Sequence, residues 1–171
     1  MISHLPFQWI SLQAKPGLRM QMTVHHIISS IAYGGGLLTG RLHFWAVFDG
    51  CCEVTTIFLS ALFLVKTHFP PGTHGVVEAV SGLGLWFAFV VFRLALFPAW
   101  LYLWYRDVQE HPEFAWDGLL PLERYFYPFV TVTVFVLSCV WMVPITKGIL
   151  KALGLIGGGK GGPKKNAKKA S

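Results

Sequence analysis

Residues 125–145 have the sequence YFYPFVTVTVFVLSCVWMVPI, a run without a single charged side chain. A helix of about 20 mostly apolar residues is long enough to cross the hydrocarbon core of a bilayer. The whole chain has a matching composition, with 54% hydrophobic and only 13% charged residues. Such a composition is typical of membrane proteins and not of soluble domains. The sequence therefore predicts an all-α, multi-pass transmembrane helical bundle.

Three further apolar segments precede this run, so we expect about four spanning helices. The additional segments are residues 23–40, 44–65 and 76–105. A Pro-Pro-Gly turn at residues 70–72 separates the second from the third, and an acidic loop separates the third from the fourth. Because Pro98 lacks a backbone N–H, we expect it to kink or end the straight part of the third span.

Positive charge is concentrated at the C-terminus. Residues 147–171 hold seven lysines and no acid, whereas the rest of the chain has seven Lys and Arg against eight Asp and Glu. A basic tail of this kind predicts a cytosolic C-terminus and gives no sign of a nucleic-acid surface. We expect a lead-in over residues 1–22, a membrane domain over 23–150 and a disordered cytosolic tail over 151–171.

The last four residues of the tail include two adjacent lysines. Lys168 and Lys169 stand fourth and third from the end of the chain. Two lysines at these positions of a cytosolic C-terminus resemble the dilysine signal for retrieval to the endoplasmic reticulum, which is read by a receptor. The alternative is a generic lysine tail that attracts anionic lipid. The predicted location is the endoplasmic reticulum membrane.

Ionisable side chains occur inside two of the predicted spans. His25 and His26 open the first span, and Asp49 and Glu53 lie within the second. Such residues usually face a protein interior and mark functional sites.

Helical spacing places one of the two histidines and both carboxylates on polar faces. His26, Ser29, Ser30 and Tyr33 share one face of the first span, and Asp49, Glu53, Thr56 and Ser60 share one face of the second. We expect the two faces to meet, which would let a carboxylate orient an imidazole as a general base or nucleophile. The alternative is hydrogen bonding that only packs helices, worth about 0.6 to 2 kcal/mol for each contact.

Arg93 lies deep in the third span, with long uncharged stretches on both sides. It is expected to form a buried ion pair with Glu53, or else to hold a lipid phosphate or carboxylate. A metal site at the histidine pair is not expected, because adjacent helical residues point about 100° apart and chelate one ion poorly. No cofactor is predicted.

Three segments, taken in order, resemble the TLC-domain family of membrane proteins. They are VHHII at residues 24–28, CEVTTIF at 52–58 and GLWFAFVVFRLALFP at 84–98. That family includes ceramide synthases, translocating-chain-associating membrane proteins and several lipid-homeostasis proteins. The resemblance implies a multi-pass protein of the endoplasmic reticulum or a related membrane, with membrane lipid as its partner.

In ceramide synthases the histidine pair carries acyl transfer from acyl-CoA to a sphingoid amine, a role that would here fall to His25 and His26 with Glu53. The chain departs from that subgroup, which has a His-Asp-x-x-Asp stretch after the pair. Here Glu53 stands at the comparable place, and Asp49 lies one turn earlier. The chain is more similar to TLC-domain proteins without an assigned reaction.

The family also normally has further helices before the histidine pair, where this chain has some 22 residues. We therefore expect either a shortened form or a truncated start, and a partner subunit or homo-oligomer that completes the site.

Three functions remain open, in this order of preference. The first is a role in membrane lipid homeostasis or lipid metabolism. The second is acyl-CoA-dependent N-acyltransfer of the ceramide synthase type. The third is a non-enzymatic structural or cargo-handling role, in which the polar faces only pack helices.

Overall fold

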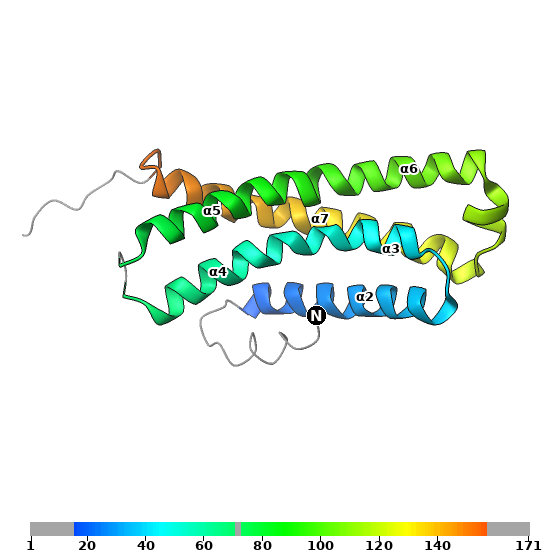
Figure 1. Cartoon of the computed structure of the whole chain (residues 1–171), viewed down its shortest axis with the longest axis horizontal. Coiled ribbons are helices and arrows are strands. Elements are labelled where there is room, and N and C mark those ends of the chain that lie inside the picture. Colours follow the sequence, from blue (N-terminus) through cyan, green and yellow to red (C-terminus); the bar gives the residue numbers. More distant parts are fainter. Residues whose placement is uncertain (1–15, 71–72, 157–171) are drawn as a thin grey trace, which may run out of the picture.

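The computed structural model describes residues 16–70 and 73–156, and within these ranges the chain forms helices and turns and no strand. Four helical arms run side by side along the longest axis of the molecule (Figure 1). The predicted all-α bundle is confirmed. The start of the first arm and the end of the last lie at the same end of the bundle (Figure 1).

The four arms are built from helices of different kinds. The first arm is α2 (Pro16–Thr39). The second consists of α3 (His43–Gly50), the 3₁₀ turn η2 (Cys51–Glu53) and α4 (Val54–His68). The third consists of α5 (Gly75–Phe89), the π-helix η3 (Val90–Ala95) and α6 (Leu96–Glu110). A short π-helix, η4 (Glu113–Asp117), leads into the fourth arm, α7 (Pro121–Ala152).

Three of the four arms are long and apolar enough to cross a membrane, namely residues 43–68, 75–110 and 121–152. The first arm differs from the prediction of about four such spans. It is a helix of 24 residues that starts at Pro16, seven residues before the expected boundary, but its mean hydropathy is lowered by polar residues and glycines. Its length alone would suffice for a crossing.

The helices continue through their prolines, so Pro98 does not end the third arm. The third arm is continuous through Pro98 and reaches Glu110. The π-helix η3 ends three residues before this proline, and such a local widening of the helix lets neighbouring backbone groups find other partners. The helix α7 likewise includes Pro128 and Pro144, and it extends beyond both ends of the predicted span.

Polar contacts tie the arms together at the end that holds the α2–α3 and α6–α7 turns. The indole Nε1 of Trp100 donates to the carbonyl of Trp45 at 2.9 Å, and the Tyr127 hydroxyl donates to the carbonyl of Ala32 at 3.2 Å. These bonds join the third arm to the second and the fourth arm to the first. The resulting frame holds the polar face of α2 against its neighbours.

Candidate functional site

The polar face of α2 points into the bundle. His25, His26 and Ser29 are buried, and His25 is only 2% exposed. The apolar residues Val24 and Ile27, on the other side of the same helix, are exposed. The structure thus places the predicted polar face of the first span where a protein interior shields it.

Two side-chain contacts join α2 to the second arm. His25 Nε2 lies 3.7 Å from Glu53 Oε1, and the Tyr33 hydroxyl donates to Asp49 Oδ2 at 3.4 Å. The other oxygen of Glu53 accepts a hydrogen bond of 2.8 Å from the Thr56 hydroxyl. Because α2 and the second arm run in opposite directions (Figure 1), the two contacts lie at successive levels along the helix pair.

These contacts bring together the imidazole and the carboxylates that the sequence singled out. The histidine that reaches Glu53 is His25, whereas the spacing argument had placed His26 on the polar face. Both imidazoles are buried, with ring centroids 5.2 Å apart. Ser60, the last residue of the predicted face on the second span, is exposed.

Arg93 comes from η3 in the third arm and is 4% exposed. Its Nε donates to the Thr55 hydroxyl at 3.0 Å, and its guanidinium carbon lies 5.1 Å from the centre of the Phe89 ring. No described carboxylate lies within 4.0 Å of the guanidinium, so the expected direct ion pair with Glu53 is not formed. Instead, His25 approaches the Glu53 carboxylate, and Arg93 donates to the Thr55 hydroxyl.

Trp141 in α7 completes the site, and sequence reasoning did not select it. Its ring meets the His25 ring edge-on at 5.6 Å, and the Arg93 guanidinium carbon lies 5.7 Å from its ring centre. Its Nε1 donates to Gln21 Oε1 at 2.9 Å. A buried indole N–H needs such a partner, so a tryptophan within a membrane segment was the available signal.

We call His25, Asp49, Glu53 and Arg93 the polar cluster. Among the described residues, His25 Nδ1, Asp49 Oδ1 and Arg93 Nη1 are buried and have no hydrogen-bond partner. Most buried polar atoms in proteins do have one. The cluster therefore retains both donor and acceptor capacity for a polar group that enters it.

The arrangement suits proton transfer more than metal binding. A carboxylate beside an imidazole is the pairing that orients a histidine as a general base. In the part of the chain that the structure describes, no three His, Cys, Asp or Glu side chains lie together as metal ligands. The predicted retrieval residues Lys168 and Lys169 lie outside the described residues.

Comparison with known proteins identifies the family. A sequence model of the TLC domain matches residues 6–147, which is most of the chain. The chain belongs to the TLC-domain family. It is 28% identical over 144 residues to TLC domain-containing protein 4-B of Danio rerio, across 82% of this chain and 52% of that protein. The chain thus spans about half the length of this curated relative. No solved structure matches it.

Proposed function

We propose that this TLC-domain protein acts in membrane lipid homeostasis, and that the polar cluster receives the polar part of a membrane lipid. The observation that carries the proposal is the 3.7 Å approach of His25 to Glu53 between helices of an apolar bundle. Ionisable groups in such a position are costly to bury and usually serve a function.

The unpartnered atoms support a ligand more than simple helix packing. A buried polar atom left without a hydrogen bond costs about 1 to 3 kcal/mol. His25 Nδ1, Asp49 Oδ1 and Arg93 Nη1 are three such atoms in one region of the bundle. If the residues served only to join helices, burial of these unpartnered atoms would lower the stability of the protein, and no other interaction would offset that cost. A bound lipid carbonyl, phosphate or hydroxyl would supply the absent partners.

The direct test is lipid analysis in cells that lack the protein. Deletion should change the membrane lipid composition, and re-expression of the natural chain should restore it. His25→Ala should fail to restore it at equal protein level. Ser60→Ala is the matched control, because Ser60 lies on the same predicted face as Glu53 but is exposed. An unchanged lipid profile on deletion would refute the proposal.

Acyl-CoA-dependent N-acyltransfer is a second candidate, favoured by the carboxylate beside His25. In that reaction the amine nitrogen would attack the acyl thioester and the C–S bond to CoA would break. His25 would accept the proton of the amine and return it to the departing thiolate, with Glu53 holding the ring. Purified protein would be incubated with a long-chain acyl-CoA and a long-chain amine. Glu53→Gln should abolish the amide product without lowering the folded yield. A structural role predicts the opposite, with no product from either protein and a lower yield of the variant.

We place the protein in the endoplasmic reticulum membrane with its C-terminus in the cytosol. Support comes from the lysine-rich tail and from the pair Lys168 and Lys169. Alanine at both positions should move the protein to later compartments. Alanine at Lys164 and Lys165 is the control, since it removes the same charge at a different distance from the end. Equal relocation of both variants would point to charge alone and reject the retrieval signal.

A further inference from the structure

Arg93 stands where three arms of the bundle meet. It belongs to the π-helix η3, which packs against η2 of the second arm and α7 of the fourth. Short π-helical segments are rare and occur frequently at functional sites. The Arg93 side chain is buried, with the Phe89 and Trp141 rings beside its guanidinium. Because an arginine keeps its charge in proteins, the third arm brings a permanent positive charge into the interior.

This positive charge has no acid in contact with it. Among the residues that the structure describes, no carboxylate oxygen lies within 4.0 Å of the guanidinium nitrogens. Glu53 contacts His25 and Thr56 instead. Asp49 accepts the hydrogen bond from Tyr33. Burial of a charge is costly unless the charge is paired, and aromatic faces recover only part of that cost.

The hydrogen bonds of the guanidinium leave one of its edges open. Nε donates to the Thr55 hydroxyl at 3.0 Å, whereas Nη1 is buried and has no partner. The planar guanidinium presents its N–H donors as a fork that matches the oxygens of a carboxylate or a phosphate. Nε and Nη1 lie on different edges of this fork, so the bond to Thr55 does not block an oxygen that approaches Nη1.

We propose that Arg93 binds the anionic group of a membrane lipid, a phosphate or a carboxylate. This inference rests on the proposed function and names the class of lipid that the polar cluster would receive. An anion would neutralise the guanidinium and also accept a hydrogen bond from Nη1. An uncharged ester or hydroxyl would do only the second. The acids of the cluster would repel an anion, but each of them already accepts a hydrogen bond from another side chain.

Lipid binding by the purified full chain tests the proposal. The chain in detergent micelles is titrated with matched lipids at alkaline pH, and native mass spectrometry measures the bound fraction. One pair is dioleoyl phosphatidic acid and dioleoyl glycerol, and the other is oleic acid and oleyl alcohol. The natural chain should bind the anionic member of a pair about 10-fold more tightly or better, because the hydrogen bond is charge-assisted. The pair that shows this preference identifies phosphate or carboxylate as the recognised group.

Replacement of the arginine should remove the preference. Arg93→Gln keeps a polar side chain without the charge. Arg124→Gln is the matched control, because Arg124 also lies over a tryptophan ring, at 5.5 Å, but donates to two backbone carbonyls. The control should bind like the natural chain. If Arg93→Gln does not fold, Arg93→Lys keeps the charge but removes the fork and should bind the anionic lipid several-fold more weakly. Unchanged binding by Arg93→Lys would overturn the proposal.

The remaining outcomes separate this inference from the proposed function. Equal affinity for the charged and uncharged members of both pairs would overturn the assignment of an anionic lipid, while a lipid role would stand. A preference that survives Arg93→Gln would also overturn it, and would indicate attraction to the seven lysines of residues 147–171. Failure of the proposed function would instead appear as an unchanged lipid profile after deletion of the protein.

Discussion

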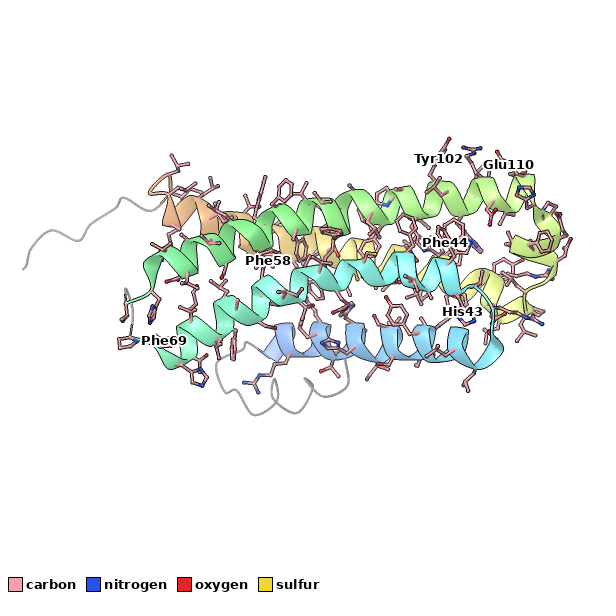
Figure 2. All side chains as sticks on the ribbon, in the orientation of Figure 1. His43, Phe44, Phe58, Phe69, Tyr102 and Glu110 are labelled. Carbon is pink, nitrogen blue, oxygen red and sulfur yellow. The ribbon has the colours of Figure 1, made fainter. Side chains whose placement is uncertain are left out.

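A tight contact between α4 and α5 leads to a prediction about two glycines. A Cβ built on Gly84 would lie 2.5 and 2.6 Å from two ring atoms of Phe58, which is closer than real Cβ contacts. Phe58 lies on the facing side of this hairpin (Figure 2). A Cβ built on Gly82, two residues earlier on the same helix, would meet nothing within 4 Å. Alanine should therefore be tolerated at residue 82 and not at residue 84.

The expected energies follow from packing and helix propensity. Forcing an extra group into a packed contact typically costs about 1 to 3 kcal/mol. Alanine in place of glycine inside a helix gains up to about 1 kcal/mol. The propensity gain is the same for both variants, so it cancels when they are compared. We expect Gly84→Ala to be about 1 to 3 kcal/mol less stable than Gly82→Ala.

The assay is reversible unfolding in mixed micelles, followed by tryptophan fluorescence as the fraction of denaturing detergent rises. Removing the ring with Phe58→Ala should abolish the difference between the two glycine variants, since the clash is with that ring. Equal stability of Gly82→Ala and Gly84→Ala in the natural background would refute the reasoning. So would a difference that persists after the ring is removed.

Two hydrogen bonds between arms give further predictions. Tyr127→Phe removes the bond to the carbonyl of Ala32 and should lower stability by about 0.5 to 1.5 kcal/mol; an unchanged unfolding midpoint would contradict this. Thr55→Val removes the acceptor of the buried Arg93 Nε and should cost more, about 1.5 to 3 kcal/mol, because the donor is charged. Thr133→Val is its control, because that hydroxyl donates to the Phe129 carbonyl one turn earlier in the same helix. An equal loss of stability in both threonine variants would exclude a special role for the arginine contact.

Composition and the lengths of the apolar runs were enough to predict the fold class. A charge-free run such as residues 125–145 has few alternatives to a helix in a membrane. The positions of the helix ends were less predictable. Proline usually ends a helix in water, but a bundle in which neighbouring groups and π-helical turns satisfy the backbone tolerates it, as at Pro98 and Pro144.

The sequence predicted which helices form the site, but it did not predict which side chains contact one another. Helical spacing showed which residues share a face, and this was enough to bring an imidazole towards Glu53. Adjacent residues such as His25 and His26 can both be buried, so spacing alone could not decide which of them meets the carboxylate. Arg93 was expected to pair with Glu53 or with a lipid group, whereas its Nε donates to the Thr55 hydroxyl and His25 approaches Glu53.

The two faces of α2 explain how its polar residues are kept away from lipid. A helix on the surface of a water-soluble protein turns its apolar face inward and its polar face outward. In α2 the order is reversed, because His25 and Ser29 are buried while Ile31 and Leu38 are 57% and 89% exposed. Mean hydropathy averages the two faces and hides this arrangement. An outward apolar face is what contact with hydrocarbon requires, and the other three arms then shield the imidazoles from the lipid. The polar cluster can therefore lie at membrane depth even though α2 is the least hydrophobic of the four arms.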